Sequence, residues 1–298
     1  MAIRVTERSR FHLPQQRIEK LRARNIAISE KLSSGLRVNR PSDDPLAAFK
    51  VQETQTHRRQ VDQYDRNLKV SDTVLAHAEQ SLGEALNTLY RIKELTIQSL
   101  SSVRTQQDAQ SIANEMRHLQ EHLRGIANTK AANRYLFGGF RQDVEPYDAA
   151  FQFVGDSNLI TLEVGDGNRA QVSVPGGAIF GDGTPNTVDV FDNIIDLRAF
   201  IIAQDEPNTQ NELERLEASI EQVIDERSNL GGLMSRIASA RTVNADLDLR
   251  LEVDLANLQD LDFPTAVSEL QLTDNALQAT LASSSRLLSG TSLLDFLR

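Results

Sequence analysis

Cysteine and tryptophan are absent from this 298-residue chain, and aromatic residues make up only 5% of it. Without cysteine the chain has no disulfides, no thiolate catalysis and no cysteine-ligated zinc. Leu, Ile, Val and Ala carry the apolar content, which favours packed helices over an aromatic-lined binding pocket. The length allows one to three domains with a buried core.

Long hydrophobic runs are also missing. The N-terminal sequence MAIRVTERSRFHLPQQ contains no apolar core of about 7–15 residues, so we expect no cleaved secretory signal. No apolar run approaches the roughly 18–20 residues that span a bilayer. No stretch combines a basic face with a broad apolar one. We therefore expect no membrane partner, and any export must use a route without such a signal.

Charge is distributed unevenly along the chain. The net charge of −10 argues against a nucleic-acid partner. Residues 1–60 hold 13 basic and 6 acidic residues, a net charge of +7, whereas residues 244–298 hold 3 basic and 9 acidic residues, a net charge of −6. The two ends are electrostatically complementary, so we expect the basic end to pair with the acidic end of the same chain.

Apolar residues recur at spacings of three and four near both ends, which is the heptad pattern of coiled-coil helices. The N-terminal stripe comprises Ile18, Leu21, Asn25, Ile28 and Leu32. The C-terminal stripe comprises Val267, Leu270, Asp274, Leu277, Leu281, Ser284 and Leu288. The polar members can fix the register of a helix pair, at a cost in its stability.

The middle of the chain repeats this helical pattern and then departs from it. Helical spacing returns over residues 75–92, 112–126 and 213–258, but nine of the 15 glycines fall between Gly138 and Gly183. Two alternating segments in that region, LITLEV and AQVSV, flank an Asp-Gly pair, which is a hairpin signal.

These patterns predict a mainly α fold. We expect an elongated, coiled-coil-like helical rod formed by pairing of the N- and C-terminal halves, with a small β-rich insert domain. The expected parts are a terminal helical assembly segment (1–45 with 262–298), a helical rod domain (46–140 with 205–261) and the insert (141–204).

One motif suggests chemistry of another class. HLQEH matches H-x-x-E-H, in which His118 and His122 would bind zinc and Glu121 would act as the base of a hydrolase. Because Leu119 and Leu123 lie on a helical seam, half-exposed helix histidines are the favoured interpretation. We predict no enzyme, no cofactor and no metal site.

Four segments together resemble the bacterial flagellin family. They are SSGLRVNRPSDDPLAA (33–48), LYRIKELTIQ (89–98), NRYLFGGF (133–140) and ELQLTDNALQATLASSSRLLSGTSLLDFL (269–297). Within that family the chain is most similar to the branch at the hook–filament junction. The prolines of NRPSDDP, the step from YLFGG straight into the insert, and the ending LLDFL favour this branch over filament flagellin.

The resemblance implies a structural, extracellular role in the flagellum, as an adaptor on which flagellin assembles. It implies export through the flagellar type III apparatus and an export chaperone that holds the C-terminal helix. The implied partners are a hook-side junction protein (the first hook-associated protein), flagellin, and copies of the chain in a short layer. A filament-forming flagellin is the alternative within the family.

The loop between the first two helices fits this resemblance in two ways. It can hold two helical parts at a set angle and contact neighbouring subunits, or it can be a plain turn whose aspartates cap the helix that begins at Pro45. The residues expected to carry assembly are Ile18, Leu21, Asn25, Ile28, Leu32, Arg37, Asn39, Arg40, Asp43, Asp44, Val267, Leu270, Leu277, Leu281, Leu288, Leu293 and Leu294.

Overall fold

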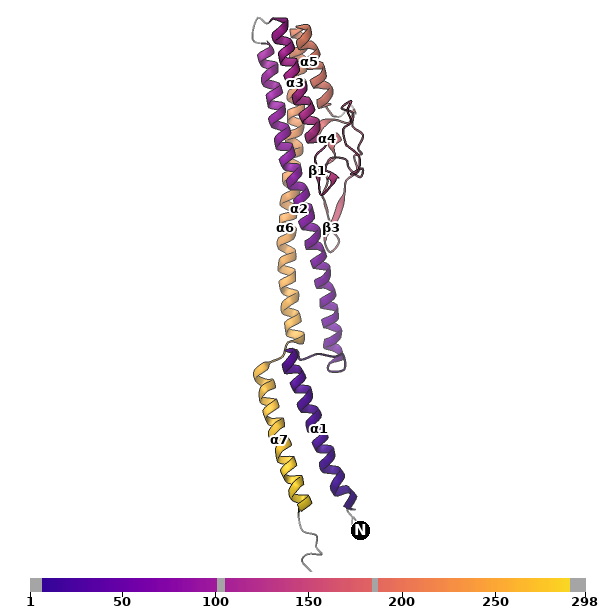
Figure 1. Ribbon diagram of the computed structural model, residues 1–298, viewed down its shortest axis with the longest axis vertical. Coiled ribbons are helices and arrows are strands. Elements are labelled where there is room, and N and C mark those ends of the chain that lie inside the picture. The colour runs from indigo at the N-terminus through magenta and orange to yellow at the C-terminus, as the bar shows by residue number, and fades with distance from the viewer. Residues whose placement is uncertain (1–6, 101–104, 184–186, 290–298) are drawn as a thin grey trace, which may run out of the picture. The chain divides into compact units, whose positions relative to one another are not determined.

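The computed structural model describes residues 7–100, 105–183 and 187–289 (Figure 1). Within these ranges the chain is mainly α with two small two-stranded sheets, so the predicted fold class is confirmed. The elements are α1 (Glu7–Ser34), α2 (Pro45–Leu100), α3 (Gln106–Ala127), β1 (Lys130–Ala131), β2 (Arg134–Tyr135), β3 (Thr161–Gly165), β4 (Asn168–Gln171), α4 (Gly176–Phe180), α5 (Val190–Ala203), α6 (Glu206–Gln259) and α7 (Phe263–Ser289).

The chain forms two compact units, and each draws on both halves of the sequence. The terminal unit combines the residues before 60 with those after 247, and the central unit comprises residues 60–247. Helices α2 and α6 contribute to both units. In the terminal unit, α1 and α7 lie side by side (Figure 1). The predicted pairing of the two halves is thus present within each unit.

The core of the central unit is made from the predicted helical stripes. On α2, Leu75, Leu82, Leu89 and Ile92 are all fully buried. They pack in one cluster with apolar residues of α3, α5, α6 and the insert. Burial of each such side chain contributes about 1.5–3 kcal/mol. A 56-residue α2 therefore depends on partners from distant parts of the chain for its stability.

The segment after α3 needs unusual backbone conformations, which explains its composition. Ala132 and Asn133, between β1 and β2, both have positive φ angles, and Asn tolerates such angles better than most residues. Gly139 has φ +64°, and a Cβ there would lie 2.2 Å from the Asp156 carbonyl oxygen. The glycines of NRYLFGGF therefore permit a close backbone approach directly after Phe137, which is fully buried.

Tyr147 lies at the centre of the insert. Its ring contacts Phe153, Phe180 and Phe191, with ring centroids 5.0–5.9 Å apart. Its hydroxyl lies 2.8 Å from the Gly181 carbonyl oxygen, to which it donates. Burial raises the pKa of Tyr147, so the hydroxyl stays neutral and serves as a donor.

The predicted hairpin is present and is attached to two helices. Strands β3 and β4 pair antiparallel around Gly167, whose φ is +63°. Asn67 of α2 donates its amide to the Glu163 carbonyl oxygen at 2.8 Å. Asn244 of α6 donates to the Val164 carbonyl oxygen at 2.9 Å. The remainder of the 141–204 segment includes irregular chain and the helices α4 and α5.

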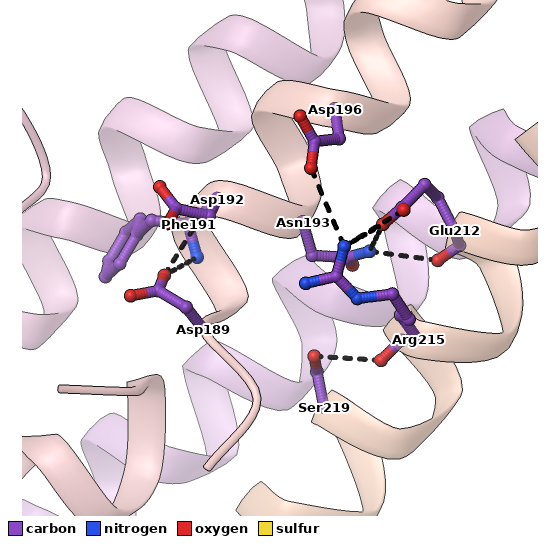
Figure 2. Close-up of polar contacts among 8 residues, drawn as sticks. All are labelled: Asp189, Phe191, Asp192, Asn193, Asp196, Glu212, Arg215 and Ser219. Carbon is purple, nitrogen blue, oxygen red and sulfur yellow. Dashed lines mark hydrogen bonds and ion pairs between the residues drawn. The ribbon is translucent and has the colours of Figure 1, made fainter. Parts of the chain in front are cut away.

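A polar network fixes α5 against α6 (Figure 2). Asp189 caps α5 by accepting hydrogen bonds from the first-turn backbone amides. The buried amide of Asn193 donates to Glu212 Oε2 at 2.7 Å, and Arg215 Nη1 donates to the same carboxylate at 2.8 and 2.9 Å. Arg215 also pairs with Asp196 at 3.6 Å. The network therefore joins α5 to α6 through side chains of both helices.

The attachment of the hairpin gives a test. We expect Asn244→Ala to leave the Val164 carbonyl unpaired in a nearly buried site, at a cost of about 1–3 kcal/mol. Amide exchange across residues 161–171 should then accelerate about tenfold or more. Asn211→Ala, an exposed change on the same helix, is the matched control and should leave hairpin exchange unchanged. Equal exchange in both variants would contradict this attachment.

Candidate assembly surfaces

The N-terminal stripe faces α7, as the sequence predicts. Ile28 is buried, and Ile18, Leu21, Asn25 and Leu32 are each half-buried. All five are less exposed than most of their α1 neighbours, so this stripe is the inner face of α1.

Two polar contacts fix the register of α1 against α7. Asn25 Nδ2 donates to Asp274 Oδ1 at 2.5 Å. Arg24, the residue before Asn25, donates from Nε to Glu269 Oε1 at 3.1 Å, in an ion pair between the basic and acidic ends of the chain. Asn25 and Asp274 are two of the three polar residues in the predicted stripes. The polar position of the α1 stripe therefore pairs with a polar position of the α7 stripe.

The buried face of α7 coincides with only part of the predicted stripe. Leu270 and Leu277 are half-buried against α1, and the most buried positions are Ala266 and Thr273. Val267 and Leu281 are 42% and 41% exposed. Small residues therefore fill the contact with α1, and part of the predicted apolar stripe remains open to another molecule.

Three predicted residues cannot be placed. Leu293 and Leu294 lie outside the described residues, as does the side chain of Leu288.

The loop from Ser33 to Pro45 is joined to the turn between α6 and α7. Arg37 N donates to the Gln259 carbonyl oxygen at 2.7 Å, and Leu261 N donates to the Gly35 carbonyl oxygen at 3.0 Å. Leu36 and Asp260 form an antiparallel bridge. Arg37 Nη2 also donates to the Leu258 carbonyl oxygen at 2.7 Å. The α1–α2 loop and the α6–α7 turn therefore pair with each other through backbone hydrogen bonds.

The aspartates organise the loop and the start of α2. Asp44 Oδ1 accepts from Ala47 N at 3.0 Å, which is N-cap geometry with Pro45 in the first turn. Asp43 Oδ2 accepts from Arg40 N at 2.9 Å and from Asn39 N at 3.1 Å. The backbone amide of Arg40 lowers the pKa of Asp43, and that of Ala47, followed by Arg37, lowers the pKa of Asp44. Asp44 therefore caps α2, as the capping interpretation expects, whereas Asp43 accepts hydrogen bonds within the loop instead. Asp43 is exposed and Asp44 is half-buried.

Arg40 belongs to a second contact of the loop. Its Nη2 donates to Glu30 Oε1 of α1 at 2.6 Å. Both groups are exposed, so the pair orients the loop and adds little stability by itself.

Two features of the terminal unit were not predicted. Arg58 of α2 holds Asp248 at 2.9 Å and Glu252 at 3.3 Å, and the i, i+4 spacing of these acidic residues is a signal that could have been read. Phe263, at the start of α7, lies 3.6 Å from the position a Cβ would take at Gly35. No local pattern indicates that second contact, because the two residues are far apart in sequence.

Comparison with known proteins bears directly on these helices. Residues 14–141 match the family described as the bacterial flagellin N-terminal helical region. The flagellar hook-associated protein 3 of Salmonella typhimurium is 23% identical over 93% of this chain and 95% of its own length. This chain is therefore similar to bacterial flagellin-family proteins over nearly its whole length.

Other relatives agree with this similarity. A flagellin of Halalkalibacterium halodurans is 24% identical over 85% of this chain and 84% of its own length. The solved structure of flagellar hook-associated protein 3 from Legionella pneumophila has a TM-score of 0.63 and 15% identity, and covers 70% of this chain and 98% of the other. That structure shows the shared fold. The predicted structural role in the flagellum, of the hook–filament junction type, is confirmed.

The hydrolase alternative gains no support from the structure or from these relatives. His118 Nδ1 and Glu121 Oε2 are 4.0 Å apart on the exposed side of α3. The described residues contain no group of three His, Cys, Asp or Glu side chains placed to hold a metal ion. The same part of the chain holds no helix long and apolar enough to cross a membrane. The relatives are structural proteins of the flagellum, not enzymes.

The polar contact at the seam gives a charge-swap prediction. Asn25→Asp should place two carboxylates against each other, and amide exchange in α1 and α7 should accelerate roughly fivefold. The double variant Asn25→Asp with Asp274→Asn reverses the donor and acceptor, so exchange should return to the original rate. Ser284→Ala is the control, because Ser284 donates within its own helix, to Thr280 O at 2.7 Å. Failure of the swap to restore protection would contradict the pairing.

The Asp44 cap gives a pH prediction. The folded-state pKa lies below the ordinary value of 3.8, so the stabilisation is present above that pH and is lost as the pH falls through the folded pKa. At neutral pH, Asp44→Ala should accelerate exchange of the Ala47 amide, whereas Asp44→Asn should preserve the cap. As the pH falls through this folded pKa, below 3.8, the NMR signal of the Ala47 amide should shift in the original protein and not in Asp44→Asn. Identical titrations would show that Asp44 does not cap α2.

Proposed function

We propose that this chain is the structural adaptor between the flagellar hook and filament, forming a short layer on which flagellin assembles. The observation that carries this is the likeness to hook-associated protein 3 over 93% of the chain. A match of that extent reaches into both α1 and α7, which pair with each other. A protein that shared only a domain with the junction proteins would match in one part.

The terminal unit offers surfaces for such a layer. Ile26 of α1 and Leu272 of α7 are 67% and 68% exposed, in addition to Val267 and Leu281. Exposed apolar side chains on a two-helix unit favour contact with another protein, which removes them from water. Copies of the chain, the first hook-associated protein on the hook side and flagellin on the filament side are the partners that we propose.

The same features suit export before assembly. Apolar positions of α7 that α1 leaves open give an export chaperone a helical face to hold. Each unit is completed only by residues from both halves of the chain, so the central unit cannot finish folding before residue 247 has emerged, and the terminal unit must wait for the C-terminal segment as well. We propose that the chain leaves the cell unfolded through the flagellar type III apparatus, without a cleaved signal peptide, and becomes part of the extracellular flagellum.

The parts of the chain are proposed to divide this work. Residues 1–45 with 262–298 form the assembly segment, residues 46–140 with 205–261 form the helical support, and residues 141–204 form the insert. The assembly segment includes the stripes and the loop residues Arg37, Asn39, Arg40, Asp43 and Asp44.

Filament-forming flagellin is the second candidate. It is favoured by one observation, the 24% identity to the Halalkalibacterium halodurans flagellin over 85% of this chain. A filament subunit must bind copies of itself without limit, whereas an adaptor stops after a short layer. The two functions therefore differ in what a strain builds when the protein is missing.

A deletion strain separates them. Without the gene for this chain, cells should make hooks without filaments and release flagellin into the medium, because exported subunits find no platform. Electron microscopy and immunoblotting of the medium measure both outcomes. Normal filaments in the deletion strain would contradict the adaptor function.

Complementation of that strain tests the proposed surface. A chain lacking residues 267–298 should not restore swimming, and neither should the full chain carrying Val267→Ser with Leu281→Ser. Val267→Ile with Leu281→Met is the matched control, because it keeps both positions apolar and should restore swimming. Equal swimming with the serine and the apolar variants would contradict a role for this face.

A further inference from the structure

Two adjacent glycines interrupt the interior of α6. Gly231 and Gly232 are both exposed, and a Cβ added to either would meet no atom within 4 Å. Neither is among the glycines with positive φ. At Gly139 and Gly176, by contrast, an added Cβ would press on neighbouring atoms. Neither packing nor backbone conformation requires glycine here, although glycine weakens a helix relative to alanine.

The helix is held on both sides of the pair and has space beside it. Arg227 pairs with Glu79 of α2 before the glycines, and Arg241 pairs with Asp72 at 3.4 Å after them. A groove of about 450 Å³ lies alongside, lined by Gly232 and Arg236 of α6 together with Gln171 and Val174 of the insert segment. The glycine pair, where helix propensity is lowest, thus lies beside the groove and between the two ion pairs that hold α6 to α2.

Core packing is retained on both sides of the glycine pair, and Leu230 also lines the groove. Leu230 and Ile237, which flank the pair, are almost fully buried in the core of the central unit. Movement at the glycines would therefore bend α6 about its packed face, and would not detach it.

We propose that Gly231 and Gly232 form a bending joint in α6, which lets the helix curve into the groove beside the insert. Glycine pairs are among the recognised causes of helix bending. The joint allows the central unit to change curvature while its core contacts remain. Its existence is independent of the hook–filament function, because it concerns one isolated molecule.

Thermal melting of the purified full-length protein tests the first part. Because the added methyl groups meet nothing, Gly231→Ala with Gly232→Ala should raise the melting temperature by about 2–4 °C per substitution. Gly125→Ala is the matched control, since Gly125 is also an exposed helical glycine with open space at its Cβ, and it should give a similar rise for its one substitution. A fall in melting temperature of the α6 variant would show that its glycines are needed structurally, and would overturn the proposal.

Spin-label distances test the bending itself. The chain has no cysteine, so labels can be placed at Glu221→Cys and Asp246→Cys, about 37 Å apart along a straight helix. Pulsed electron resonance should give a broad distance distribution in the original sequence and a clearly narrower one when both glycines are alanine. The Gly125→Ala variant should keep the broad distribution.

A second label pair localises the effect. Labels at Asn211→Cys and Asp225→Cys lie on one side of the glycines, so their distance distribution should not change with alanine. An unchanged distribution for the spanning pair, or equal narrowing for both label pairs, would overturn the joint.

Discussion

The structure depends on apolar stripes that are too narrow to be buried by their own helices. Leu75, Leu82 and Leu89 repeat once every two turns on α2, and they leave water only when α3, α6 and the insert cover them. Helices of 56 and 54 residues gain little from local propensity in comparison with this burial. The fold is therefore a pairing of the two halves of the sequence, and a relative must retain both halves to keep it.

The same constraint acts with less strength in the terminal unit. There the contact between α1 and α7 is made by half-buried leucines, by small residues such as Ala266, and by the Asn25–Asp274 hydrogen bond. A polar contact in a seam lowers stability but selects one register. This suits a protein whose ends must be handled during export and then find a single arrangement in a repeating assembly. The exposed apolar residues of α1 and α7 are then available to stabilise the unit through contacts with other subunits.

Features marked by a local sequence pattern could mostly be predicted, whereas contacts between residues far apart in the sequence could not. The α2 stripe, the hairpin at Asp166-Gly167 and the Asp44 cap follow from local patterns, and each is present. The buried face of α7 was misplaced at Val267 and Leu281, because a 3,4 pattern cannot distinguish apolar residues that face α1 from those that face another molecule. The crossing of Leu36 with Asp260 joins residues more than 200 positions apart, and no local signal marks it. The polar attachment of the hairpin by Asn67 and Asn244 is hidden in the same way.

The adaptor function confines this chain to a short layer at one place in the flagellum. The most direct measurement is immunogold electron microscopy of flagella whose only copy of the chain carries an epitope inserted at Gly167, in the exposed turn of the hairpin. The adaptor function predicts gold in one narrow band at the hook–filament boundary of each flagellum. Gold along the length of the filament, or none at that boundary, would contradict it.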